Sequence, residues 1–176
     1  PLSLTMTVFG RVPVGLALTR SGAQPGDLLC VGGELGNGAG ALPLVLGQRM
    51  ADAAIADPLR AHYWSPQPQL GLGLALRGKA TAALDLSDGL LADCGHIALA
   101  SKVGVQVERS KLPLSKALLA FLGQSGAEQA ALSGGDDYVL AFTLPPAELP
   151  SLLADGWPIH VVGQVVNGQG VTLLDA

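Results

Sequence analysis

The stretch Ala-Leu-Asp-Leu-Ser-Asp-Gly-Leu-Leu at residues 83–91 places two acids and a hydroxyl where an apolar strand pattern passes into a helical one. The N-terminus of a helix presents free backbone N–H groups and a partial positive charge, which favour anions. Carboxylate oxygens are the ligands that a hard cation such as Mg²⁺ prefers. The junction therefore predicts a site that binds magnesium and phosphate together. Because Ser87 or Asp88 ahead of Gly-Leu-Leu also fits an ordinary helix N-cap, both interpretations stay open.

Short apolar runs alternate with helical patterns along the rest of the chain. Strands are expected at residues 2–9, 12–18, 28–31, 81–86, 103–107, 138–144 and 159–166, with 171–174 as the hairpin partner of the last. Helices are expected at residues 41–54, 70–76, 89–101, 116–122, 127–132 and 145–154, and residues 57–69 are expected to be irregular. The pattern predicts an α/β or α+β fold with a mixed sheet and packed helices.

Composition and charge exclude several classes of protein. The chain is 49% hydrophobic but 4% aromatic, which favours a core of Leu, Val, Ile and Ala in strands buried on both faces. Its net charge of −4 and scattered Lys and Arg residues argue against nucleic-acid binding. No apolar run reaches the roughly 18 residues that a membrane span requires. The lone thiols Cys30 and Cys94 are expected to be buried in a reducing, cytoplasmic environment.

Two glycine-rich segments have more than one interpretation. Gly36-x-Gly38-x-x-Ala41 formally matches a dinucleotide-binding pattern, but it starts too far from the preceding strand, so a flexible loop or a phosphate-facing nest is favoured. Ser-Gly-Gly-Asp-Asp at residues 133–137 fits either a helix C-cap followed by a solvated turn, or an acidic rim that binds a cationic or hydrogen-bond-donating ligand.

The remaining polar residues give weaker signals. Arg20, beside Ser-Gly, is either a surface arginine or a phosphate clamp. His62, His96 and His160 share no spacing that indicates a metal site, and His96 is expected to be structural. No Walker A lysine pattern is present, which excludes a P-loop kinase.

Three motifs together resemble the thiamine-monophosphate kinase family, in the superfamily of aminoimidazole ribonucleotide synthetase. They are Thr-Arg-Ser-Gly-Ala-x-Pro-Gly-Asp at residues 19–27, Leu-Asp-Leu-Ser-Asp-Gly-Leu at 84–90, and Ser-Gly-Gly-Asp-Asp-Tyr at 133–138. Their order and spacing agree with the family over nearly the whole chain. The resemblance implies that residues 1–10 are the last strand of a missing N-terminal domain and that residues 11–176 are a C-terminal domain that binds ATP and substrate.

The resemblance also implies an activity. It is the ATP-dependent phosphorylation of thiamine monophosphate to thiamine diphosphate by direct in-line transfer with Mg²⁺, in a homodimer formed through the N-terminal domain. Asp85 and Asp88 match metal ligands, Arg20 and Ser87 match ATP-contacting positions, and Asp136 matches a position that contacts the substrate. With most of the other ligands assigned to the missing domain, the 176-residue piece alone is expected to be inactive.

The chain departs from the family pattern at several positions. The family usually has Glu at Asp136, Asp at Asn37 and Arg at Gln69, and its C-terminal aromatic residue lies beyond residue 176 or is lost. The departures at Asp136 and Asn37 keep open a non-catalytic binding or assembly module with the same fold. Another ATP-dependent enzyme of the superfamily is the second alternative, and the Gly-Gly-Asp-Asp-Tyr segment argues against it.

Overall fold

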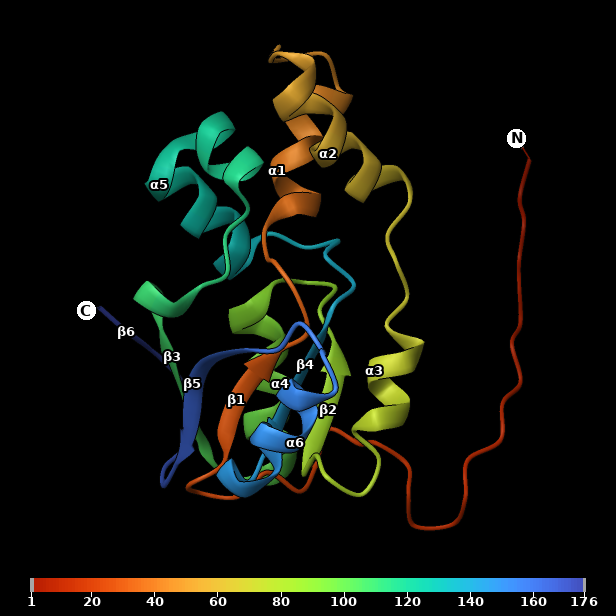
Figure 1. Cartoon of the computed structure of the whole chain (residues 1–176), viewed down its shortest axis with the longest axis vertical. Coiled ribbons are helices and arrows are strands. Elements are labelled where there is room, and N and C mark those ends of the chain that lie inside the picture. The colour runs from red at the N-terminus through yellow and green to blue at the C-terminus, as the bar shows by residue number, and fades with distance from the viewer. Residues whose placement is uncertain (1, 176) are drawn as a thin grey trace.

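The computed structural model describes residues 2–175 (Figure 1). The strands are β1 (Leu28–Val31), β2 (Ala82–Asp85), β3 (Gly104–Glu108), β4 (Leu140–Leu144), β5 (His160–Val166) and β6 (Gly170–Leu174). The α-helices are α1 (Asn37–Val45), α2 (Ala53–Trp64), α3 (Leu70–Ala75), α4 (Leu90–Ser101), α5 (Lys116–Ser133) and α6 (Leu149–Ala154). Short 3₁₀ helices lie at η1 (Arg109–Lys111) and η2 (Pro146–Glu148).

The strands form one mixed sheet in the order β2-β4-β1-β5-β3-β6. Every neighbouring pair is antiparallel except β3 and β6, which are parallel. The expected fold class, a mixed sheet with packed helices, is confirmed. None of the helices described between residues 2 and 175 is long and apolar enough to cross a membrane.

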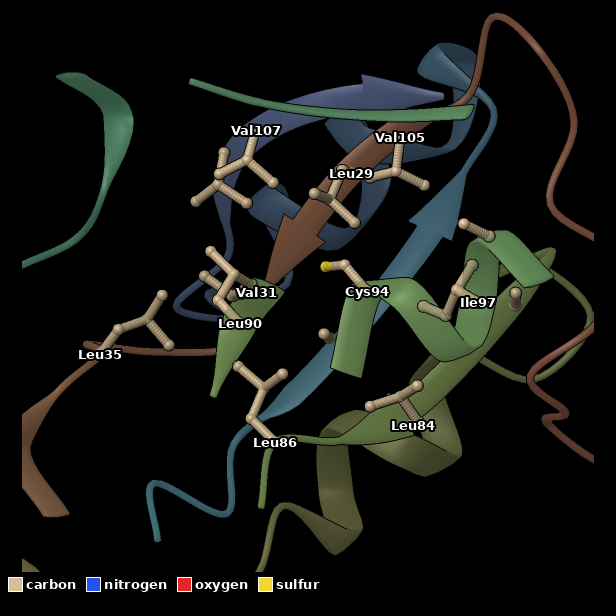
Figure 2. Close-up of a cluster of buried hydrophobic side chains, with 14 of the residues drawn as sticks. Leu29, Val31, Leu35, Leu84, Leu86, Leu90, Cys94, Ile97, Val105 and Val107 are labelled. Carbon is tan, nitrogen blue, oxygen red and sulfur yellow. The ribbon is translucent and has the colours of Figure 1, made fainter. Parts of the chain in front are cut away.

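Alternation along each strand divides the core between the two faces of the sheet. On β1, Leu29 and Val31 pack in the cluster with α4, whereas Cys30 packs in the cluster with α3 and α6. Figure 2 shows the first cluster, where Leu90, Cys94 and Ile97 of α4 meet the strands. Because both faces are covered, the strands are apolar on both sides, as their composition predicts.

A third cluster lies beyond one end of the sheet, where α1, α2 and α5 pack together (Figure 1). Its members include Leu44 of α1, Leu59 of α2, and Leu118 and Phe121 of α5. This helical layer supports the glycine-rich loop between β1 and α1, and that loop borders the candidate site.

Several predicted elements form with shifted ends, and others were wrong. The two helices expected at 116–122 and 127–132 are confirmed as the two parts of α5, which is broken at Gly123, whose φ of 70° and ψ of 175° are not helical. The helix expected at 41–54 begins earlier and ends at Val45, and the segment expected to be irregular at 57–69 is largely α2. Pro58 lies inside α2 and does not end this helix.

The hairpin expected between residues 159–166 and 171–174 was also wrong. β5 already has β1 on one side and β3 on the other, so it offers no free edge to β6. The turn between β5 and β6 instead passes close to Gly104 at the start of β3. A Cβ added at Gly104 would lie only 3.5 Å from the carbonyl oxygen of Asn167 in this turn. β6 then pairs with the outer edge of β3, and Val171 packs against the α4 cluster.

The N-terminal segment forms neither of the strands expected at residues 2–9 and 12–18. It runs apart from the sheet (Figure 1), and the side chains of Leu2, Leu4, Met6, Val8 and Phe9 are 79–91% exposed. A strand needs a partner for its backbone groups, and the described part of the chain supplies none here. Pro1 and Ala176, the outer ends of the two expected domains, lie outside the described residues.

Candidate functional site

The junction after β2 is shaped by Asp93, a buried acid in the first turn of α4. Its Oδ2 accepts hydrogen bonds from the backbone N–H groups of Ser87 (2.9 Å) and Asp88 (3.0 Å). The N-cap residue of α4 is Gly89, with a φ of 102° and no side-chain capping bond. The interpretation of Ser87 or Asp88 as an ordinary N-cap was therefore wrong, and both side chains remain available for other contacts.

The two expected magnesium ligands are exposed. Asp85 ends β2 and Asp88 lies in the following turn. The three residues before Asp85 in β2 are buried, but Asp85 itself is not. Because Asp85 faces solvent, its charge carries little desolvation cost, and any metal role rests on its position rather than on burial.

The Gly-Gly-Asp-Asp-Tyr loop lies directly against this junction. The N–H of Asp136 donates to the carbonyl of Ser87 (3.2 Å), and the N–H of Tyr138 donates to that of Leu86 (2.8 Å). A Cβ at Gly135 would collide with the Ser87 carbonyl oxygen, so the close approach requires glycine. Asp85, Ser87, Asp88 and Asp136 are thus brought together by two hydrogen-bonded loops.

Asp136 is held in an unusual conformation. Its φ is 66° and that of Tyr138 is 53°, both in the left-handed region that residues other than glycine seldom adopt. The phenol of Tyr138 donates to Oδ1 of Asp136 at 2.7 Å. This hydrogen bond, followed by the nearby Asp136 charge, raises the pKa of Tyr138. The phenol therefore remains a hydrogen-bond donor at neutral pH.

The neighbouring Asp137 faces the other way and caps α1. Its carboxylate is 4% exposed and accepts from the N–H groups of Gly36 (2.6 Å) and Gly38 (3.1 Å). Burial raises the pKa of Asp137, and these amides and His62 oppose the shift. Because a protein carboxylate occupies the start of α1, the interpretation of this glycine loop as a phosphate-facing nest was wrong.

Arg20 is not joined to the acidic residues. Its segment runs beside β2, where Thr19 accepts from the N–H of Ala83 (2.8 Å), and the Arg20 carbonyl accepts from the hydroxyl of Ser101 (3.3 Å) at the end of α4. The twelve residues of α4 separate this point from Asp88, about 18 Å along the helix. Within residues 2–175, no hydrogen bond or ion pair links the Arg20 guanidinium to the four polar residues of the two loops.

Three side chains at the start of α4 fit a divalent cation. Asp88, Asp93 and His96 each offer one ligand atom, and these atoms lie within 4.8 Å of one another. Two carboxylates and an imidazole are a common donor set for such ions. Asp85 is not a member of this group in the described chain. His96 had been expected to be structural, and its three-residue spacing from Asp93 was the signal that could have identified it.

The side chain of Gln69 links two strands at the end of the sheet next to the site. Its Nε2 donates to the carbonyl of Gly32 (2.6 Å), and its Oε1 accepts from the N–H of Leu140 (2.8 Å). The side-chain amide thus joins the end of β1 to the start of β4. At this position the family pattern usually has arginine, and a guanidinium, which has no acceptor, could not make the second bond.

Two cavities flank the loops. A cavity of about 910 Å³ is largely apolar, with Leu16, Leu70 and Leu74 in its wall and Asp85 and Tyr138 at its polar margin. A second cavity, of about 430 Å³, is lined by polar groups that include Glu34, Asn37, His62 and Asp137. The loops therefore stand between a space suited to an organic ring and a space suited to polar groups.

Comparison with known proteins agrees with this architecture. The family described as AIR synthase related protein, C-terminal domain, matches residues 24–176. Thiamine-monophosphate kinase of Escherichia coli strain K12 is 46% identical over 170 residues, which cover 94% of this chain and 52% of that protein. The chain thus spans about half the length of the curated relative.

Solved structures give the same result. The crystal structure of thiamine-monophosphate kinase from Stenotrophomonas maltophilia K279a has a TM-score of 0.85 and 42% identity, covering 92% of this chain and 54% of that one. A structure of AaThiL complexed with AMPPCP and TMP has a TM-score of 0.80 and 31% identity, covering 89% and 50%. With its sheet order, its helical layers and the match over residues 24–176, the chain belongs to the AIR synthase related protein family and contains its C-terminal domain.

Proposed function

We propose that the protein containing this chain is a thiamine-monophosphate kinase, which transfers the γ-phosphoryl group of ATP to thiamine monophosphate. The observation that carries the proposal is the meeting of two hydrogen-bonded loops, which gathers Asp85, Ser87, Asp88 and Asp136 beside an apolar cavity. The 46% identity to a thiamine-monophosphate kinase over 94% of the chain supports it. That identity favours this substrate over those of other ATP-dependent enzymes of the superfamily.

The residues divide the task by charge. Asp85 and Asp88 are proposed to hold Mg²⁺, and the carboxylate-rich group at the start of α4 supports this for Asp88. Bound magnesium would neutralise the charge of two phosphates that approach each other. Ser87 is proposed to contact ATP through its hydroxyl. Arg20 is proposed to contact an ATP phosphate through its guanidinium.

Asp136 is proposed to contact the thiamine part of the acceptor. Its carboxylate is exposed and oriented by the Tyr138 phenol, and the thiazolium ring of the substrate is cationic. The shorter side chain, compared with the Glu that is usual in the family, leaves room for the substrate to approach the loop more closely. No general base is needed, because the acceptor phosphate is already ionised. Catalysis then consists of positioning and charge neutralisation.

The test is ATP-dependent formation of thiamine diphosphate by the full-length protein and by its Asp85→Asn variant. Loss of a metal ligand is expected to reduce kcat by about 100-fold or more, since metal charge supplies several kcal/mol at the transition state. Asp155→Asn is the matched control, because Asp155 is an exposed acid after α6, away from the loops. A wild-type rate in Asp85→Asn would remove Asp85 from the metal site, and no turnover by the wild type would favour a non-catalytic module.

The proposal also includes a requirement for the N-terminal domain and for a cytoplasmic homodimer formed through it. The 176-residue chain is expected to show no thiamine diphosphate formation under conditions in which the full-length protein is active. Turnover by the chain alone would show that residues 1–176 contain a complete site.

A further inference from the structure

Asp137 is a buried acid to which the proposed reaction gives no role. Its two carboxylate oxygens each accept one backbone hydrogen bond, Oδ2 from Gly36 at 2.6 Å and Oδ1 from Gly38 at 3.1 Å. One side chain thereby ties the Gly-Gly-Asp-Asp-Tyr loop to the start of α1. Gly38 allows this contact, because a Cβ there would collide with the carbonyl oxygen of Asp136.

The hydrogen bonds of Asp137 lie at the part of the loop whose backbone is strained. The residues on either side, Asp136 and Tyr138, both have positive φ, a conformation that persists only when surrounding contacts hold it. Their backbone N–H groups are bonded to Ser87 and Leu86 on one side of the loop. The Asp137 carboxylate is the side-chain contact that holds the loop from the other side.

His62, on the last turn of α2, completes this arrangement. Its Nε2 lies 3.7 Å from Oδ1 of Asp137, slightly too far for a hydrogen bond. Nε2 is buried, and among the described residues it has no hydrogen-bond partner. Both side chains line the polar cavity of about 430 Å³. A buried ring nitrogen without a partner, beside a buried carboxylate, is best satisfied by donating its proton to that carboxylate.

We propose that His62 and Asp137 are a positioning pair, in which His62 Nε2–H donates to Asp137 and keeps the loop in the form that presents Asp136 to the acceptor substrate. An imidazole that carries its proton on Nε2 supplies the donor for this hydrogen bond. Neither residue is assigned a contact with the substrate. The part of the inference that concerns Asp136 rests on the proposed function, whereas the pair itself does not.

The first test measures the pair directly in the full-length protein. Hydrogen exchange of a peptide that covers Gly36 and Gly38 is compared in wild type, His62→Leu and His62→Gln. His62→Leu removes the donor and is expected to speed exchange about tenfold, whereas His62→Gln keeps an N–H donor and should restore protection. His160→Leu is the matched control, because His160 is an exposed histidine at the start of β5. Unchanged exchange in His62→Leu, or equal loss in His62→Gln, would overturn the pair.

The second test measures positioning by the affinity for thiamine monophosphate in calorimetry without ATP. His62→Leu is expected to weaken binding about fivefold, and to have no added effect when Asp137→Asn is already present, because coupled residues are not additive. Faster hydrogen exchange with an unchanged affinity for thiamine monophosphate would overturn the positioning role but not the hydrogen bond between His62 and Asp137. If the wild type does not bind thiamine monophosphate, the proposed function and the positioning role both fail, and the exchange result alone still decides whether the pair exists.

Discussion

Asp93 offers the sharpest test of how the sequence builds the junction. Its carboxylate is 3% exposed and accepts the N–H groups of Ser87 and Asp88. Asp93→Ala leaves both amides without this partner. Hydrogen bonds to a charged group contribute about 1.5–3 kcal/mol each, and solvent can reach the turn in part, so the expected loss in free energy of unfolding is about 2–4 kcal/mol. For a chain of this length that corresponds to a fall in Tm of about 5–15 °C.

Asp93→Asn separates hydrogen bonding from charge. The amide oxygen can still accept from the turn, so only the interaction of the charge with the helix dipole and the charge-assisted part of the bonds is lost, about 1 kcal/mol. Thermal unfolding is followed by circular dichroism in the presence of a chelator, so that no divalent cation contributes. The exposed acid Asp155, replaced by Ala, serves as the control. An Ala variant within 2 °C of wild type, or Asn and Ala variants with equal loss, would refute the role of this carboxylate as a brace.

Two further predictions follow from close packing and from burial. Gly135→Ala should reduce thiamine diphosphate formation by about tenfold or more, because the new Cβ would push the loop away from the Ser87 carbonyl. Gly95→Ala is the control, because a Cβ at this position of α4 meets no other atom; it should raise the free energy of unfolding by about 0.5–1 kcal/mol and leave the rate unchanged. Burial raises the pKa of Cys30 and of Cys94 to about 12, so neither should react with dithionitrobenzoate at pH 8 until the protein unfolds. Rapid labelling of the native protein would contradict the burial. Because the pKa of these thiols is near 9.0 in the unfolded chain and about 12 in the folded one, the free energy of unfolding should also fall as the pH rises through that interval.

The sequence predicts most of the sheet, because its strands are short apolar runs flanked by turn residues. It also predicts the break at Gly123 and the helix that follows the Asp-x-Ser-Asp-Gly motif. What it misses depends on partners distant in the chain. The start of α1 is capped by Asp137, about one hundred residues away, so no local cap marks it. The position of β6 likewise depends on which sheet edges other strands have already taken.

The same distinction separates the two kinds of acid at the site. Asp85, Asp88 and Asp136 are candidates from the motifs, because they stand at or next to turns between elements, and all three are exposed. Asp93, just after the Asp-x-Ser-Asp-Gly motif, and Asp137, within the Gly-Gly-Asp-Asp-Tyr loop, are buried, and the carboxylate of each accepts hydrogen bonds from two backbone amides. Because Asp93 and Asp137 hold the backbone of the two loops, replacing either buried acid should disturb the site by moving the exposed acids that the same loops carry.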